Sequence, residues 1–595
     1  MIKVSDYIVQ FIEQQKVRHV FMLAGGMAMH INDSLGNAKN LRPICMLHEQ
    51  ACAYAAESYA RITNNLGAVV ATSGPAAINI LNGIAASWIE STPLLAITGQ
   101  CKRMDIAQDP NLRQMGVQEV NIVAMAKPIT KYAVQIWDPN MIQYELEKAV
   151  YLAQEGRKGP VLLDIPLDVQ ASKIEPDRLP HFEPTIHQYE ASIILLDEIV
   201  QLLNNAKRPL LYAGAGIRMA NAGVEFRILV ERLGIPVLVH WNAMGILESD
   251  HPLYAGIPGA LGHRAANFAL QTCDVLITIG TRLSLLQTGY NFAEYAKNAK
   301  LIMVDIDEAE LNKKTLHPYM KVHADAGAFV SELNKRKDIV INDYSKWNKQ
   351  IQLWRRKYPS IKPEWREAKE YVNSFVLAET ISKYMTSDNV YVGGRAGTCV
   401  DAVIQAFLTK RNQGVYVTKG LSAMGNGLPA AIGGAYATGK KVICINGDGG
   451  FIMNIQELEV VRRDQLPIKF FVLDNNGYST IRATQTGVFN GHFVGCNPES
   501  GLTLGNIRGV AEAYGIQTCT IDSSVRLDEM VQEVLHGDEP IVCIVKVAPD
   551  QPIEPRQANY KTAEGQMASR PLEDMRPLLD RTEICEVMKI TNELV

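Results

Sequence analysis

The sequence predicts an α/β protein made of three doubly wound, parallel-sheet domains. Short apolar runs recur along most of the chain, and many of them end at glycine. Segments with apolar residues at helical spacing separate these runs. Strands that alternate with helices predict parallel sheets covered by helices on both faces. The length of 595 residues, 47% of them hydrophobic, is enough for about three or four domains of ordinary size.

The composition excludes several classes of function. A formal net charge of −4 means that the chain lacks the excess of positive charge that is typical of proteins that bind nucleic acid. No apolar run reaches the length of a membrane span, and no basic-then-apolar signal opens the chain. Ten cysteines are scattered without a Cys-x-x-Cys pair, which is typical of reduced thiols. We therefore expect a cytoplasmic protein with no nucleic-acid partner and no membrane partner.

The first predicted domain covers residues 1–185. Its strands are expected at 20–23, 44–47, 68–71 and 94–98. A polar or glycine-containing turn follows each strand, and in a parallel sheet the carboxyl ends of the strands form the edge where ligands bind. These turns are Ala24-Gly25-Gly26, His48-Glu49-Gln50, Thr72-Ser73-Gly74-Pro75 and Gly99-Gln100.

The second predicted domain covers 190–345, with strands at 209–213, 275–279 and 301–306. Its first strand ends at Gly214-Ala215-Gly216, which lacks the third glycine of a dinucleotide fingerprint. After the third domain, a tail at 551–595 is expected either to pack on the body or to stay mobile until a ligand binds.

The third predicted domain, 370–550, contains the most informative stretch of the chain. A short strand at 443–446 ends at Gly447-Asp448-Gly449, and a crossover helix is expected over 453–463. The next strand, 468–473, ends at Asp474-Asn475-Asn476-Gly477. Asp448 and Asn475 are therefore expected at the same edge of a parallel sheet.

Asp448, Asn475 and the Gly477 carbonyl would form an all-oxygen set suited to Mg²⁺. Magnesium keeps sites for water or phosphate, so this set predicts a clamp for a diphosphate. Gly449 and Gly450 would let the backbone approach the phosphates closely. The alternative interpretation is an ordinary strand–turn–helix with an Asx turn at each end.

Taken in order, these motifs give the chain a resemblance to a known family. It resembles the acetohydroxyacid (acetolactate) synthase-like branch of thiamine diphosphate (ThDP) enzymes over nearly its whole length. The matching pieces are Gly25-Gly26, His48-Glu49-Gln50, Thr72-Ser73-Gly74-Pro75, Thr98-Gly99-Gln100, Gln118-Glu119, Gly280-Thr281-Arg282, Met424-Gly425-Asn426-Gly427-Leu428-Pro429, Gly447-Asp448-Gly449 and Asn475-Asn476.

The resemblance implies a ThDP pyrimidine-binding domain (1–185), a central domain (190–345) and a ThDP diphosphate-binding domain (370–550), followed by the tail (551–595). It also implies ThDP and Mg²⁺ as cofactors. In this family the active site lies between two subunits, so we expect a homodimer or homotetramer.

Glu49 matches the family's carboxyl group that hydrogen-bonds the aminopyrimidine N1′ of the cofactor and promotes loss of the thiazolium C2 proton. The alternative is a first-turn acid at a helix N-terminus. Met424 matches the bulky residue over which the cofactor bends, and its alternative is a core methionine. Ser422 matches the residue whose carbonyl holds the cofactor's amino group, although the family usually has glycine there.

Further residues match the family's cofactor site. The loop at Gly394, Ala396 and Gly397 fits a backbone cradle for the diphosphate, although relatives often place Gln or His in it. The metal set implied is Asp448, Asn475 and Gly477. The remaining cofactor-binding positions are Thr72, Asn79, Gly447, Gly449, Gly450 and Tyr478.

A second group of residues matches the substrate side of the family's site. Gly25 and Gly26 fall where relatives keep small residues beside the substrate, and Gln118 matches a polar side chain near the reacting carbon. Val117 replaces a phenylalanine common in true acetohydroxyacid synthases, which would open space for a larger acceptor. His48 and His30 are more readily explained as structural residues than as catalytic ones.

Two stretches resemble homologues associated with cell-surface sugar biosynthesis, in which a two-carbon unit is joined to a nucleotide-linked keto sugar. These stretches are 477–485 and 572–579. Arg482 lies just past the cofactor motif and is expected either to bind an anionic group of the acceptor or to be an ordinary surface arginine.

The central domain of relatives binds FAD, an ADP-like group or nothing. Here FAD is the expectation, since several turns are compatible with it: Gly214-Ala215-Gly216, Gly262-His263, Gly280-Thr281-Arg282 and Asp305-Ile306-Asp307.

The predicted function is a ThDP- and Mg²⁺-dependent carboligase that decarboxylates a 2-keto acid such as pyruvate and transfers the two-carbon acyl unit to a carbonyl acceptor. One alternative is a 2-keto acid decarboxylase, or a lyase or hydrolase of a cyclic diketone. A decarboxylase is disfavoured because the chain has no His-His pair of the kind found in pyruvate decarboxylases. Another alternative is a silent cofactor-binding homologue, against which Glu49, Asp448 and Asn475 argue.

Overall fold

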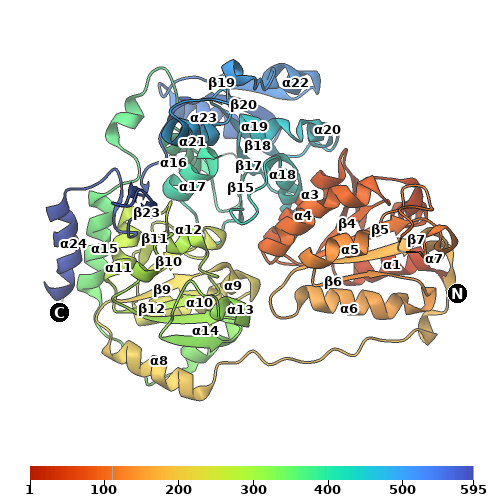
Figure 1. Cartoon of the computed structure of the whole chain (residues 1–595), viewed down its shortest axis with the longest axis horizontal. Coiled ribbons are helices and arrows are strands. Elements are labelled where there is room, and N and C mark those ends of the chain that lie inside the picture. The colour runs from red at the N-terminus through yellow and green to blue at the C-terminus, as the bar shows by residue number, and fades with distance from the viewer. Residues whose placement is uncertain (110, 395–396, 594–595) are drawn as a thin grey trace.

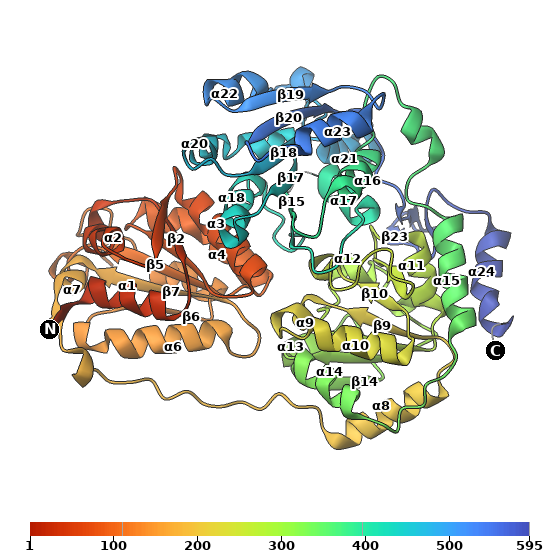
Figure 2. The ribbon, with the colours of Figure 1, turned by 180° about the vertical axis from the view of Figure 1, so that it is seen from behind.

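The computed structural model describes residues 1–109, 111–394 and 397–593, and it contains three six-stranded parallel sheets. The sheets belong to three lobes that follow one another along the chain (Figure 1). An extended segment without helix or strand, 179–192, runs from the first lobe to the central one (Figure 2). The fold class predicted from the sequence is confirmed.

The first and third sheets have the same topology. Each places its six strands, numbered within the sheet in chain order, as second, first, third, fourth, sixth and fifth. The first sheet consists of β2 (His19–Met22), β3 (Arg42–Cys45), β4 (Gly67–Ala71), β5 (Leu94–Gln100), β6 (Tyr132–Gln135) and β7 (Pro160–Pro166). The third consists of β15 (Val390–Gly393), β16 (Val415–Val417), β17 (Val442–Gly447), β18 (Ile468–Asp474), β19 (Gln517–Ile521) and β20 (Ile541–Lys546).

The central sheet has the strand order of dinucleotide-binding folds, third, second, first, fourth, fifth and sixth. Its strand order therefore reverses between the first and fourth strands, which is where such sheets bind ligands. The strands are β9 (Pro209–Ala213), β10 (Val237–Val239), β11 (Tyr254–Gly256), β12 (Val275–Ile279), β13 (Lys300–Asp305) and β14 (Met320–His323).

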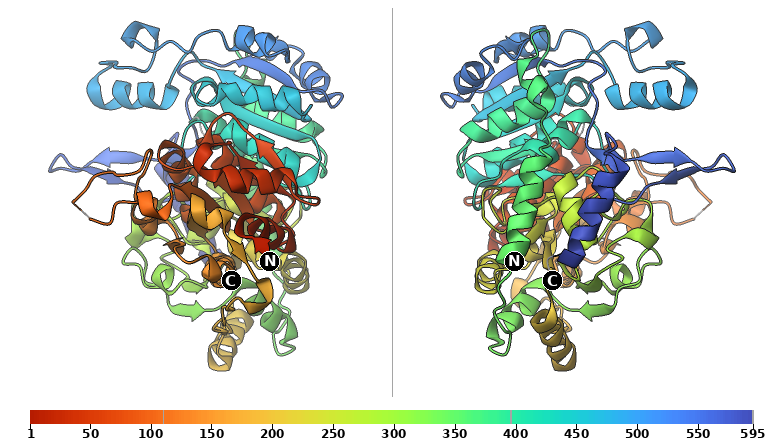
Figure 3. Two further views of the ribbon diagram at one scale, coloured as in Figure 1. Left: turned by 90° about the vertical axis from the view of Figure 1, so that its right-hand side faces the viewer. Right: turned by 90° about the vertical axis from the view of Figure 1, so that its left-hand side faces the viewer.

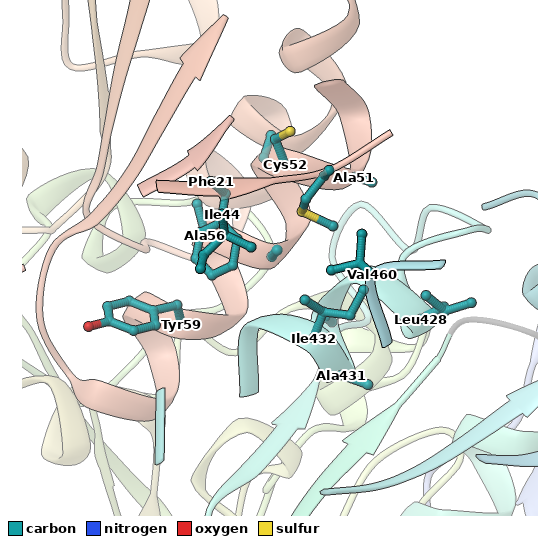
Figure 4. Close-up of a cluster of buried hydrophobic side chains, with 14 of the residues drawn as sticks. Phe21, Ile44, Ala51, Cys52, Ala56, Tyr59, Leu428, Ala431, Ile432 and Val460 are labelled. Atoms are coloured by element: carbon teal, nitrogen blue, oxygen red, sulfur yellow. The ribbon is translucent and has the colours of Figure 1, made fainter. Parts of the chain in front are cut away.

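Two helices join the first and third lobes through small residues. Helices α3 (Glu49–Thr63) and α18 (Gly427–Thr438) cross so closely that a Cβ at Gly433 would lie 2.1 Å from the carbonyl oxygen of Ala55. Ser58 Oγ donates a hydrogen bond of 2.7 Å to the Ala430 carbonyl. Figure 4 shows the apolar side chains of both helices meeting in one buried cluster. This shared core fixes the first lobe against the third within one chain.

The tail packs on the central lobe through polar contacts. From α11 (Arg264–Thr272), Arg264 Nη2 donates to the Pro577 carbonyl at 2.6 Å and Asn267 Nδ2 to the Leu572 carbonyl at 3.0 Å. The tail ends in α24 (Arg581–Glu593). Its hairpin, β22 (Asn559–Lys561) and β23 (Met567–Ser569), projects away from the body (Figure 3).

The crossover helix predicted over 453–463 is broken in the structure. A short helix, α19 (Asp448–Ile452), precedes the 3-10 turn Ile455–Glu457, and α20 covers Leu458–Arg463. The break is at Asn454, whose backbone leaves the helical region at φ −132° and whose Nδ2 donates to the Gly425 carbonyl at 2.7 Å. A tertiary contact therefore overrides the helical pattern.

Candidate active site

Glu49 lies at the carboxyl edge of the first sheet, as the first residue of α3. Its Oε2 accepts a hydrogen bond of 3.0 Å from Asn79 Nδ2, on helix α4 (Pro75–Ile89). The carboxyl group is half-buried and is held by a neighbour on the adjacent helix. His48 is the N-cap of α3, where its Nδ1 accepts from the Gln50 amide at 3.1 Å, so it has a structural role.

Three more of the predicted residues lie at this edge, after β2 and β4. A Cβ at Gly25 would lie 2.4 Å from Thr72 Cγ2, so only glycine fits against this threonine. Thr72 Oγ1 also accepts from the Met27 amide at 3.0 Å. Gly26, in contrast, faces open space, because a Cβ added there would meet no heavy atom within 4 Å.

The loop after β5 carries Gln118 and packs on Gly74. Gly74 has φ +61°, and a Cβ there would lie 2.5 Å from the Gln118 carbonyl oxygen. Gln118 itself has φ +60° and is exposed, and Val117 beside it is 75% exposed. The structure thus brings Gly25, Glu49, Thr72 and Gln118 to one sheet edge.

Asp448 occupies the corresponding edge of the third sheet, after β17. It is buried, its Oδ1 accepts from the Gly449 amide at 2.7 Å, and its Oδ2 accepts from the amides of Asn475 and Gly477, each at 3.2 Å. Burial raises the pKa of this carboxyl to about 6, while the three amides act in the opposite direction. The carboxylate therefore joins the ends of β17 and β18.

The oxygens at this edge fit a divalent cation. Asn475 Oδ1 is buried, and no donor among the described residues reaches it. A buried amide oxygen without a partner is costly unless a bound ion or water satisfies it. Together with the Asp448 carboxylate, it offers the hard oxygen ligands that Mg²⁺ takes in proteins.

Met424 and Tyr478 both lie against Gly449. A Cβ at Gly449 would be 2.3 Å from Tyr478 Cε1 and 3.4 Å from Met424 Cε, so a larger residue would displace both side chains. Ser422 has φ +57°, a conformation that glycine adopts at lower cost. This explains physically why glycine is common at that position in the family that the sequence resembles.

The loop after β15 faces the same edge. A Cβ at Gly394 would be 2.4 Å from Asn446 Cγ, and one at Gly397, which has φ +41°, would be 2.1 Å from Thr480 Oγ1. Gly447 directly precedes Asp448, and Gly450 follows it by two positions in α19. Ala396 lies outside the described residues. At both Gly394 and Gly397 a neighbouring side chain occupies the place of a Cβ, so the loop packs this closely against the sheet edge only with glycine.

A cavity of about 490 Å³ lies at the switch point of the central sheet. Gly214 after β9 and Gly280 after β12 meet there, since a Cβ at Gly214 would be 2.0 Å from the Gly280 carbonyl oxygen. Residues of all three lobes line the cavity, among them Glu90, Arg157, Gly216, Arg282, Asp305 and Lys419.

Two features of the site were missed by sequence reasoning. Glu457 is fully buried, and both its carboxylate oxygens accept from the Leu47 amide at 3.2 Å, next to Glu49. Glu90 Oε1 accepts from the Gly420 amide at 2.9 Å and holds the segment that leads to Ser422. Both contacts join residues more than 300 positions apart, so no local pattern signals them.

Arg482 does not face an open cleft. Its residue is 6% exposed, and its guanidinium donates to main-chain carbonyls. Both expectations for it are therefore wrong: its guanidinium is turned into the protein, away from an acceptor, and it is not a surface arginine. Sequence alone did not reveal the burial because the surrounding helix is polar.

Within the part of the chain that the structure describes, no helix is both long and apolar enough to cross a membrane. Three family models match the sequence in chain order. They are the thiamine pyrophosphate enzyme N-terminal TPP binding domain at residues 2–125, the central domain at 196–333 and the C-terminal TPP binding domain at 395–545.

Known relatives match nearly the whole chain. The probable acetolactate synthase large subunit of Methanococcus aeolicus is 32% identical over 565 residues, covering 92% of each chain. The acetolactate synthase large subunit of Pyropia yezoensis is 32% identical and covers 93% of each chain. Acetolactate synthase isozyme 1 large subunit of Escherichia coli (strain K12) is 30% identical, covering 93% of this chain and 95% of its own. The chain belongs to the acetolactate synthase-like family of ThDP enzymes, and it is a ThDP-dependent carboligase of that type.

Proposed function

We propose that this carboligase takes its two-carbon unit from pyruvate, releases carbon dioxide and transfers the unit to a carbonyl acceptor larger than a second keto acid, such as a nucleotide-linked keto sugar. The observation that carries the acceptor is the small size of two residues at one sheet edge. Gly26 has no side chain, and valine stands at Val117, beside Gln118, where a bulkier phenylalanine is usual. The resemblance of 477–485 and 572–579 to sugar-modifying homologues supports the same class of acceptor.

The contacts of the residues support the following roles. When bound, ThDP supplies a nucleophilic carbon and accepts the electron pair released on decarboxylation. Glu49, oriented by Asn79, holds a proton against the pyrimidine ring. Asp448, Asn475 and the Gly477 carbonyl would hold Mg²⁺, and the loops at Gly394, Gly397 and 447–450 would receive the diphosphate.

The remaining assignments concern the cofactor body and the substrate. Met424 and Tyr478 pack against Gly449 and support the cofactor from the diphosphate side, with Ser422 presenting its carbonyl. Thr72 shapes the pyrimidine side through its contacts with Gly25 and Met27. Gln118, exposed on its loop, reaches the reacting carbon.

We propose that the site is completed by a second copy of the chain, in a homodimer or homotetramer. Within one chain, α18 follows directly after Met424, and Ser58 is the α3 residue that hydrogen-bonds it. Glu49 lies nine positions earlier on α3, about 13 Å along the helix axis. Glu49 thus lies away from the start of α18 in its own chain, and in this proposal it serves the cofactor of a second copy.

We propose that the central cavity binds FAD or another adenine nucleotide. The strand order of the central sheet and the close glycine contact at its switch point support this assignment. Cys45 and Cys585 are exposed free thiols, which supports a cytoplasmic location. The domain limits that we propose remain 1–185, 190–345 and 370–550, with the tail at 551–595.

The donor and acceptor are tested together by NMR of the purified protein with ThDP, Mg²⁺ and ¹³C-labelled pyruvate. We expect slow acetaldehyde formation from pyruvate alone and a new adduct when a nucleotide-linked keto sugar is added. Efficient acetolactate formation from pyruvate alone would contradict the proposed acceptor. Unchanged pyruvate in the presence of bound ThDP would contradict the donor, and other keto acids and cyclic diketones would then be screened.

A further inference from the structure

Helix α21 (Ser479–Phe489) is anchored by a charge. Arg482 is its single buried residue, and the side chain is 7% exposed. A surface helix ordinarily packs through an apolar stripe, and a buried charge is costly unless hydrogen bonds satisfy it. A leucine would anchor the helix at lower cost, so the contacts of the guanidinium point to a function beyond packing.

The guanidinium joins two loops at the carboxyl edge of the third sheet. Nη2 donates to the Asn475 carbonyl at 3.1 Å and to the Pro549 carbonyl at 2.6 Å, and Nη1 donates to the Asn476 carbonyl at 3.5 Å. The loops follow β18 and β20, which are paired neighbours in the sheet. Nε lies 3.3 Å from Asp550, whose side chain is 88% exposed, so that ion pair is a weak surface contact.

The loop at 475–477, which we call the metal loop, is therefore held from two sides. Asp448 Oδ2 accepts from its amides at Asn475 and Gly477, while Arg482 donates to its carbonyls at Asn475 and Asn476. The loop needs such support because two consecutive residues, Asn476 at φ +58° and Gly477 at φ +128°, have positive φ.

We propose that Arg482 is a positioning residue for the metal loop. By turning the carbonyls of Asn475 and Asn476 toward itself, it sets the direction of the Asn475 side chain and of the Gly477 carbonyl. Its role is to preorganise these oxygens before the metal arrives, and not to bind the acceptor. The inference rests on the metal site proposed above and deepens it.

The test compares Arg482→Met and Arg482→Lys with Arg508→Met in the full-length protein. Arg508 is a suitable control because it is an exposed arginine of the same lobe that pairs only with Glu512 among its described contacts. Two quantities are measured: the Kd of Mg²⁺ by calorimetry in the presence of ThDP, and hydrogen–deuterium exchange of the metal loop in metal-free protein.

We expect Arg482→Met to raise the Mg²⁺ Kd by about 10- to 100-fold, as loss of a residue that orients metal ligands commonly does. Exchange should accelerate at the amides of Asn475 and Gly477. Arg482→Lys, which keeps the charge without the planar fork, should recover part of the affinity. Arg508→Met should match the wild type in both measurements.

Wild-type Mg²⁺ affinity in Arg482→Met would overturn the inference. Asp448→Asn separates this failure from failure of the metal site itself. If Asp448→Asn weakens Mg²⁺ binding and Arg482→Met does not, the metal site is supported and the positioning role of Arg482 is wrong. If neither variant weakens Mg²⁺ binding, the proposed metal site is wrong as well. Should Arg482→Met fold poorly, Arg482→Lys alone must still show weaker Mg²⁺ binding.

Discussion

At the scale of single residues, Glu49 depends on one neighbour for its orientation. Asn79 Nδ2 donates to Glu49 Oε2 at 3.0 Å, and the two side chains come from adjacent helices of the same lobe. Holding the carboxyl group in the direction of the ring nitrogen should accelerate the reaction, because a misplaced carboxyl group reaches the reactive geometry less often.

Asn79→Ala should therefore lower kcat by about 10-fold, equivalent to about 1.4 kcal/mol of transition-state stabilisation. The matched control is Asn82→Ala on the same helix, which removes the acceptor of a hydrogen bond from the Tyr54 hydroxyl and leaves Glu49 untouched. Steady-state rates of pyruvate consumption compare the two. Equal rates for Asn79→Ala and the control would show that Glu49 does not need Asn79.

Site residues could be predicted from the sequence where a chemically suitable residue type stands at the end of a predicted strand, and not elsewhere. Asp448 and Asn475 were predicted to share an edge because both follow buried strands of a parallel sheet, and the amide of one does donate to the carboxylate of the other. Glu457 and Arg482 carry no such local signal. Their contacts depend on burial and on chain segments far away in sequence, which only the folded structure brings together.

At the scale of elements, the packing of α3 on α18 sets how the two half-sites lie within one chain. Gly433→Ala would place a methyl group 2.1 Å from the Ala55 carbonyl oxygen, so the helices must separate. We expect a loss of about 1–3 kcal/mol, seen as a clear fall of the thermal unfolding midpoint. Gly487→Ala in α21 is the control, since a Cβ there meets nothing within 4 Å and should stabilise by up to about 1 kcal/mol. A wild-type midpoint for Gly433→Ala would mean that the crossing is looser than described.

Elements were predictable where burial alone defines them. The strands expected at 209–213 and 275–279 match β9 and β12, because strands buried on both faces are continuous apolar runs. The helix expected over 453–463 failed, since the side chain of Asn454 is used to hold Gly425. Helical spacing does not reveal that a polar residue has a distant partner.

At the scale of the whole molecule, buried carboxyl groups between the lobes make stability depend on pH. Burial raises the pKa of both Glu57 and Glu457 to about 7, compared with an ordinary value of 4.5. The folded protein therefore holds these protons more tightly than the unfolded chain does. The stability that they contribute is complete below pH 4.5 and is lost as the pH rises through 7.

Between pH 6 and 8, each such group should lower the free energy of unfolding by about 1 kcal/mol. Glu457→Gln should keep the contact with the Leu47 amide and remove the titration, so its unfolding midpoint should fall less over this range than that of the wild type. Glu459→Gln is the control, because Glu459 is paired with Arg462 and its pKa is lowered. The same pH dependence of the unfolding midpoint in Glu457→Gln and in the wild type would show that Glu457 does not cause the pH dependence of stability.

The central claim is that one active site combines Glu49 of one chain with Asp448 of another, and mixing two inactive variants tests it most directly. Glu49→Gln and Asp448→Asn should each abolish carboligation in the purified protein. After the two are unfolded and refolded together in equal amounts, half of the dimers should be hybrids with one intact site of two, so activity should return to about a quarter of the wild-type value. If hybrids form and remain inactive, Glu49 and Asp448 act within the same chain and the account is contradicted.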